Sequence, residues 1–110
     1  MIDIKFEDFI TEEMITKKNE LRSLQHKERM ARLNLHGSDY KTSKIVDGEY
    51  TEAEIEVIKA NRSQWRQEVR LCEQEIPILK LEVDKLFAEA KQKYQEELNK
   101  LQEQFLVLGE

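Results

Sequence analysis

The stretch Gly48–Leu71, GEYTEAEIEVIKANRSQWRQEVRL, decides the fold because it contains a clear helix start. Thr51 is followed three residues later by Glu54, so each side chain can bond the backbone N–H of the other as a capping box. Glu52 and Glu54 also place negative charge at the positive end of the helix dipole. We therefore predict that a helix begins directly after Thr51.

This helix is predicted to run towards Leu108, because one apolar stripe continues along it. Its residues are spaced alternately three and four apart up to Ala90 and again from Leu98, which is the a/d spacing of a left-handed coiled coil. A run of fours from Ala90 to Leu98 is a discontinuity, where the supercoil is expected to unwind locally. The stripe consists of Ile55, Ile58, Arg62, Trp65, Val69, Cys72, Ile76, Leu79, Val83, Leu86 and Ala90, then Tyr94, Leu98, Leu101, Phe105 and Leu108. Pro77 is the one conflict, because proline removes a helix hydrogen bond and clashes with the preceding turn. The helix either kinks and continues there or reverses into a three-helix bundle, and the unbroken phase of the stripe favours continuation.

The sequence before this helix predicts three shorter elements. Residues 1–10 begin with alternating apolar and charged letters and are expected to form an extended arm. A first helix is predicted over residues 11–36, ending at Gly37, since glycine takes up the left-handed conformation at a helix end without strain. Residues 37–50 form a connector, in which Ser38 can cap a short helix. The stripe of the first helix is expected to comprise Met14, Leu21, Leu24, Ala31 and Leu35, interrupted by Lys17 and Glu28.

These elements predict a single all-α domain, an elongated helical hairpin whose long helix spans residues 51–108. That helix, of about 57 residues, would be roughly 85 Å long, and the first helix, of about 24 residues, roughly 36 Å. The first helix is then too short to cover the stripe beyond Leu79, so we expect other copies of the chain to cover it as a coiled coil. The predicted oligomer seam is Leu79, Val83, Leu86, Leu98, Leu101 and Phe105, and both a dimer and a trimer are compatible with it.

The sequence contains no pattern typical of catalysis or of cofactor binding. His26 and His36 are ten residues apart, whereas two metal ligands on one helical face need a spacing of three or four. Cys72 lies on the apolar stripe and is expected to be a buried structural thiol. The chain has no glycine-rich phosphate loop and no Ser/His/Asp arrangement. We therefore predict a protein that is not an enzyme and that has no metal site and no cofactor.

A basic side of the long helix is the strongest candidate for a ligand site. It comprises Lys59, Arg62, Trp65, Arg66 and Arg70, and the first helix is also rich in lysine and arginine. Cations around an aromatic residue can bind nucleic acid or another phosphate ligand. The favoured interpretation is that these cations pair with glutamates across the hairpin. A net charge of −5 also disfavours a general binder of nucleic acid or of anionic membranes.

The segment Asp39–Val69 reads DYKTSKIVDGEYTEAEIEVIKANRSQWRQEV. It resembles a short element of tail-region proteins from phages and prophages of Gram-positive bacteria. The matching residues are Asp39, Tyr40, Lys41, Lys44, Gly48, Thr51, Glu54, Arg62, Trp65, Arg66, Glu68 and Val69. The resemblance implies a phage-encoded helical structural or assembly module, of a kind often trimeric in tail fibres, and it implies no catalytic residue.

Together these patterns predict a phage-encoded helical structural, assembly or interaction protein that acts through coiled-coil oligomerisation. Its expected partners are further copies of itself and another phage or host protein. Two alternatives remain: a small phage inhibitor or ligand-sequestering protein directed at a host target, and a nucleic-acid-binding regulator. The sequence begins without a secretory signal and has no apolar run of the ~20 residues that span a bilayer, so we expect it in the host cytoplasm or the virion, without a membrane partner.

Overall fold

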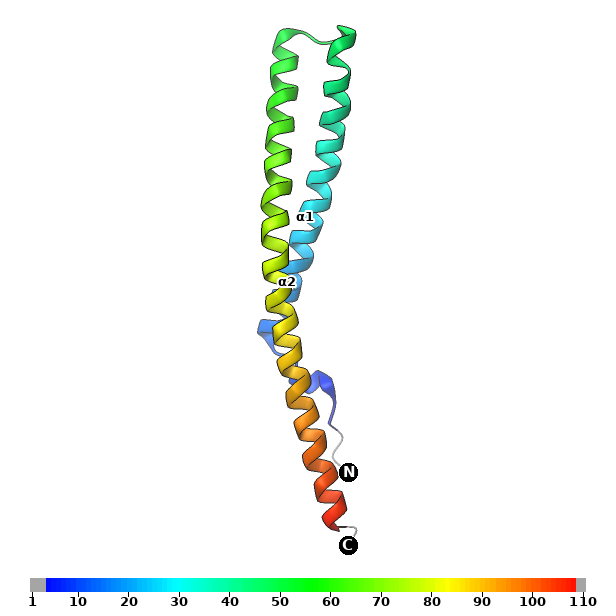
Figure 1. Cartoon of the computed structure of the whole chain (residues 1–110), viewed down its shortest axis with the longest axis vertical. Coiled ribbons are helices and arrows are strands. Elements are labelled where there is room, and N and C mark those ends of the chain that lie inside the picture. Colours follow the sequence, from blue (N-terminus) through cyan, green and yellow to red (C-terminus); the bar gives the residue numbers. More distant parts are fainter. Residues whose placement is uncertain (1–3, 109–110) are drawn as a thin grey trace. The chain divides into compact units, whose positions relative to one another are not determined.

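The structure is a computed structural model that describes residues 4–108, and these residues form an all-α helical hairpin (Figure 1). The element order is η1 (Phe6–Phe9), α1 (Glu12–Ser43), η2 (Ile45–Asp47) and α2 (Glu52–Leu108), where η denotes a 3₁₀ turn. No strand occurs within the described residues, so the predicted fold class is confirmed. Residues 1–3, at the start of the predicted arm, lie outside the described part of the chain.

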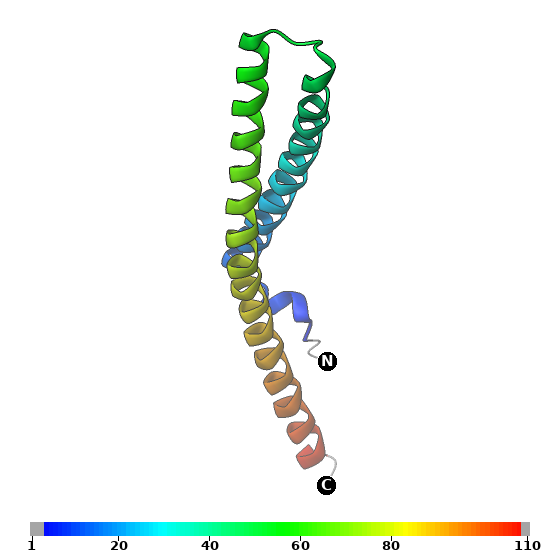
Figure 2. The same cartoon turned by 45° about the horizontal axis from the view of Figure 1, so that its top comes forward.

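The chain divides into two compact units, which we describe separately. In the unit Leu21–Ile78, α1 and α2 lie side by side and antiparallel, and η2 joins them (Figures 1 and 2). Three ion pairs connect the helices there, one of them between Arg62 of α2 and Asp39 of α1. Arg32 Nη2 lies 2.6 Å from Glu73 Oε1, and Lys27 Nζ lies 2.8 Å from Glu68 Oε1.

The start of α2 is the capping box that the sequence predicts. The Glu54 backbone N–H donates to Thr51 Oγ1 at 3.3 Å, and the Thr51 backbone N–H donates to Glu54 Oε1 at 3.2 Å. The Thr51 hydroxyl also donates to Glu54 Oε1 at 2.9 Å. Two backbone donors that have no partner within the helix are thereby satisfied.

Thr51→Ala is expected to lower the free energy of unfolding by about 1 kcal/mol, because the Glu54 N–H loses its acceptor. Thr51→Ser is the matched control, since serine keeps the hydroxyl and caps helices at least as well as threonine. Chemical denaturation followed by circular dichroism measures both variants. Equal stability of the alanine and serine variants would contradict a role for this cap.

The predicted end of the first helix is wrong: α1 continues past His36 and ends at Ser43. Gly37 lies inside the helix and does not have a positive φ. The left-handed glycine is Gly48, with φ 74° and ψ 15°, and its N–H donates to the Ile45 carbonyl at 3.1 Å. The reversal of the chain is therefore built around η2 and Gly48, where only glycine has the required backbone freedom.

Tertiary packing explains why α1 does not stop at Gly37. Ser38 is the next residue on the stripe after Leu35, and it is buried although it is polar. Thr42 follows one turn later and is half-buried, and its hydroxyl donates to the Ser38 carbonyl at 2.8 Å. Asp39 accepts a charge-assisted hydrogen bond from Arg62 of α2. These contacts hold the turn against α2 and override the local stop signal.

The predicted stripes of both helices are confirmed by burial. All predicted stripe positions of α2 from Ile55 to Leu101 are buried or half-buried, and so are all those of α1, including Lys17 and Glu28. Within the described residues the buried apolar side chains are Met14, Ala31, Ile58, Val69, Cys72, Val83 and Ala90. The core of each unit is thus thin and consists mostly of small side chains.

The unit that combines Met1–Glu20 with Leu79–Glu110 contains an aromatic cluster. Phe6 and Phe9 of η1 approach Tyr94 of α2 edge-on, with ring centroids 5.8 and 5.9 Å apart. The Lys18 ammonium lies 5.3 Å from the centroid of the Phe87 ring. Edge-to-face pairs and cation–π contacts of this kind are favourable beyond the area that they bury.

The N-terminal arm is therefore only partly extended. Lys5 has extended backbone angles, but residues 6–9 form a 3₁₀ turn in place of the predicted continuous arm. The Lys5 N–H donates to Asp8 Oδ2 at 3.3 Å and so caps this turn. The turn brings both phenylalanines to the same side, where they cover Tyr94.

Pro77 does not end α2, so the predicted continuation is confirmed and the three-helix reversal is wrong. Proline leaves the carbonyl four residues earlier, that of Glu73, without its helical donor. Both Pro77 and Glu73 are exposed, so the proline lies outside the packed side of α2.

Candidate functional site

The predicted oligomer seam is covered by this chain over a longer stretch than expected. Val83 is only 8% exposed, Ala90 is buried, and Leu79, Leu86, Leu98 and Leu101 are half-buried. The expectation that the stripe lacks a partner within the chain from Leu79 onwards is therefore wrong. Among the six predicted seam residues, only Phe105 is exposed.

Two features of the N-terminal region explain this coverage. Met14, in the first turns of α1, is buried, and Lys17 lies 3.5 Å from Glu82 of α2. The aromatic pair of η1 then reaches Tyr94. The expected N-terminal arm was not assigned to α2, and so the prediction underestimated how far these residues cover that helix.

The last turn of α2 remains exposed and is apolar on all sides. Phe105, Leu106, Val107 and Leu108 are consecutive and between 60% and 82% exposed. A large apolar group of this kind at a helix end marks an interaction surface. We call these four residues the C-terminal patch.

In the structure, the five residues of the predicted basic side of α2 have different surroundings. Arg62 is bound to Asp39, and Trp65 is half-buried on the stripe. Lys59, Arg66 and Arg70 are exposed, and no ion pair joins them to a carboxylate within residues 4–108. The five residues therefore do not converge on one point.

The favoured interpretation of pairing across the hairpin holds for three cations of α1: Lys17, Lys27 and Arg32. Lys27 bonds Glu68, and this hydrogen bond raises the pKa of the Lys27 ammonium. Arg32 bonds both Glu28 and Glu73, and these hydrogen bonds raise the pKa of its guanidinium. Both cations are exposed, so each of these ion pairs contributes little to stability.

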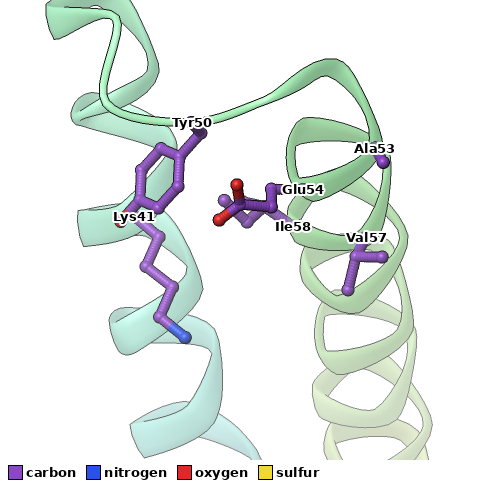
Figure 3. A pocket seen from close by; sticks show the side chains of 6 residues that line it. All are labelled: Lys41, Tyr50, Ala53, Glu54, Val57 and Ile58. Atoms are coloured by element: carbon purple, nitrogen blue, oxygen red, sulfur yellow. The ribbon is translucent and has the colours of Figure 1, made fainter.

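A hollow of about 340 Å³ lies between the two helices close to the capping box (Figure 3). Tyr50, Ala53, Val57 and Ile58 supply apolar walls, and the stem of Lys41 lies beside the Tyr50 ring. The remaining lining residue, Glu54, is held by the capping box. This volume is at the lower end of the range for ligand pockets, and the lining contains no nucleophile or general base placed for chemistry. The hollow can accept an apolar side chain of a partner.

Cys72 is the structural thiol that the sequence predicts. It is only 2% exposed, and burial raises the pKa of the thiol because the thiolate would lose its hydration. Since the thiolate is the reactive form, the raised pKa and the lack of access both make Cys72 inert.

Cys72 is expected to react with Ellman's reagent at pH 8 at least about tenfold more slowly in the folded protein than in the denatured chain. Because the folded thiol has the higher pKa, the denatured chain releases the thiol proton first as the pH rises, so the contribution of Cys72 to stability should decrease above the ordinary thiol pKa. Absorbance at 412 nm, with and without guanidinium chloride, measures the reaction rates. Equal rates in both states would contradict the buried position.

The remaining candidates for chemistry are separated or absent in the described part of the chain. His26 and His36 are both exposed, and no group of three potential metal ligands occurs within residues 4–108. Over the same residues, neither helix contains an apolar segment that could cross a bilayer.

One surface was missed by the sequence interpretation. Met30, Leu33 and Tyr40 are exposed on α1, and they fall on a second stripe with spacings of three and seven residues. The helical spacing of these three residues is visible in the sequence. However, the expected helix end at Gly37 placed Tyr40 outside the first helix, apart from Met30 and Leu33.

The chain was also compared with known proteins. No protein-family model, no curated protein and no solved structure matches it.

Proposed function

We propose that this chain is a helical structural or assembly protein of a phage, and that it self-associates as a coiled coil through the end of α2. The observation that carries the proposal is the C-terminal patch, where four consecutive large apolar side chains are exposed on an intact helix. Burial of one such side chain gains about 1.5–3 kcal/mol, so covering the patch is strongly favourable.

The spacing of the residues at this end supports pairing between helices. Leu98, Leu101, Phe105 and Leu108 follow the a/d spacing. The first two are half-buried, whereas Phe105 and Leu108 are 60% and 82% exposed. Leu98 and Leu101 are therefore partly covered within the chain, whereas the apolar surfaces of Phe105 and Leu108 are available to a partner. A second copy that lies along this stripe buries Phe105 and Leu108 in the way that coiled-coil seams do.

The resemblance to phage tail-region proteins supports the proposed setting. The residues that carry it are structural ones in this chain: Asp39 binds Arg62, Gly48 adopts the left-handed conformation, and Thr51 and Glu54 form the cap. The resembling segment is therefore a self-contained helical reversal. A module of this kind positions helices for assembly and needs no catalytic group.

The test is the absolute mass in solution, measured by light scattering on a sizing column over a range of concentrations. The proposal predicts a dimer or a trimer of the 13.2 kDa chain, with a mass that decreases on dilution. A mass of one chain at all concentrations, up to those of the sizing column load, would refute self-association.

A further inference from the structure

The outer side of α1 carries a second stripe that remains exposed, although the Lys44 ammonium lies 5.6 Å from the centroid of the Tyr40 ring. His26, Met30, Leu33, Gly37 and Tyr40 are spaced four, three, four and three residues apart. All five residues are exposed, and the exposed fractions of Met30, Leu33 and Tyr40 are 45%, 66% and 64%. At 3.6 residues per turn they fall within a sector of about 80°, opposite the stripe that faces α2.

The charges around this stripe have one sign. Between Leu21 and Ser43 the only carboxylates are Glu28 and Asp39, and both are half-buried on the side of α2. Glu28 is bonded to Arg32, and Asp39 is bonded to Arg62. The exposed outer side therefore presents Arg22 and Arg29 beside the apolar stripe, with no carboxylate of α1 next to them in this segment.

Gly37 forms a notch in the middle of the stripe. It has an ordinary helical conformation, and a methyl group added at its Cα would meet no atom within 4 Å. Neither the backbone nor the packing of this chain requires glycine here, although glycine weakens a helix interior relative to other residues. In helix pairs, a small residue between larger ones admits a side chain or the backbone of the neighbouring helix.

We propose that the outer stripe of α1 binds an acidic amphipathic helix of another protein, which places a large apolar side chain over Gly37. The a/d spacing matches the seam of a helix pair, and Met30, Leu33 and Tyr40 are the apolar anchors. Arg22 and Arg29 select a partner with carboxylates beside its apolar stripe.

The width and composition of the stripe favour a helix over other ligands. A helix that lies in a membrane surface needs a broad apolar side, whereas this stripe is as narrow as a coiled-coil seam. A nucleic-acid surface has cations in its centre, whereas here apolar side chains occupy the centre and cations flank them. A second α1 is disfavoured as the partner, because its outer side carries no carboxylate to pair with Arg22 and Arg29.

The experiment measures binding of two synthetic helical peptides to the full-length protein by fluorescence anisotropy at low ionic strength. Both peptides are about four heptads long with leucine at a and d, and they have either glutamate or lysine at e and g. The glutamate peptide is expected to bind at least about tenfold more tightly than the lysine peptide, and this preference should weaken with added salt. Equal binding of the two peptides, or no binding of either, overturns the proposal.

Three variants locate the binding site, and a fourth serves as a control. Leu33→Glu and Arg29→Glu should each weaken binding of the glutamate peptide about tenfold or more. Both residues are exposed, although Arg29 also lines a hollow together with Ile76 of α2. Gly37→Gln should raise the Tm, because glutamine is the better helix former, and still weaken binding by filling the notch. Phe105→Glu, in the C-terminal patch, should leave binding unchanged.

Two results would reassign the surface. Binding that is lost in Phe105→Glu and retained in Leu33→Glu would place the peptide on the C-terminal patch and overturn the proposal. Binding of the protein to anionic phospholipid vesicles, with loss in Leu33→Glu and no binding of either peptide, would assign the stripe to a membrane surface instead.

Discussion

Phe105→Glu is expected to convert the protein from an oligomer into a single chain of 13.2 kDa while its helix content stays the same. Phe105 is 60% exposed and makes no contact that the fold of one chain needs, so the variant should remain folded. In a coiled coil, the new carboxylates would face each other across the seam without cations to pair with them. The seam loses the burial of an aromatic ring and gains charge repulsion, an effect of at least about 3 kcal/mol for each chain.

Leu81→Glu is the matched control for this experiment. Leu81 is also on α2 and is 71% exposed, but it is not on the stripe. If any loss of exposed apolar surface weakened association, both variants would dissociate. We expect only Phe105→Glu to do so, as measured by light scattering and circular dichroism on the same samples. An oligomeric Phe105→Glu protein would place the interface elsewhere.

The fold was largely predictable because its main signals are local and periodic. The capping box at Thr51 depends on residues only three positions apart, and the stripes depend on a spacing that a helix turns directly into burial. The continuation through Pro77 followed from the unchanged phase on both sides. Each of these signals is independent of what the rest of the chain does.

The parts that were not predictable depend on contacts between distant residues. His36-Gly37 has the letters of a helix end, but Ser38 and Asp39 pack against α2, and this packing determines the outcome. The η1 turn is similar, because its role depends on Tyr94, far along the chain. The sequence next to such an element contains no information about its distant contact residues.

The candidate site was predictable only at its C-terminal end for the same reason. Phe105 was correctly expected to be uncovered, whereas Val83 and Leu86 were assigned to the oligomer seam although the chain covers them itself. Periodicity identifies an apolar stripe but not the element that covers it. Which part of the α2 stripe is covered depends on how far along it the N-terminal region packs. That region includes the η1 turn, whose sequence has no helical periodicity.

Val69→Asp is expected to unfold the hairpin or to lower its Tm by at least about 15 °C. Val69 is 6% exposed in a core that consists of a single line of side chains, so no second layer can compensate for its loss. A carboxylate at this position must lose its hydration or separate the helices, and an unpaired buried charge costs about 3–5 kcal/mol. That cost is a large fraction of the stability of a domain of this size.

Leu71→Asp provides a stringent control for this prediction. It removes a larger apolar side chain from the same helix, two residues further on, but Leu71 is 46% exposed and points away from the stripe. Hydrophobicity alone would make Leu71→Asp the more damaging change, whereas the hairpin geometry makes it the milder one. Thermal unfolding followed at 222 nm distinguishes the two. An equal loss of stability in both variants would mean that the Val69 and Leu71 sides of α2 are equally buried. This result would contradict the packing of α1 against α2 described above. If only Val69→Asp unfolds, the thin core between α1 and α2 is the element that holds the chain together.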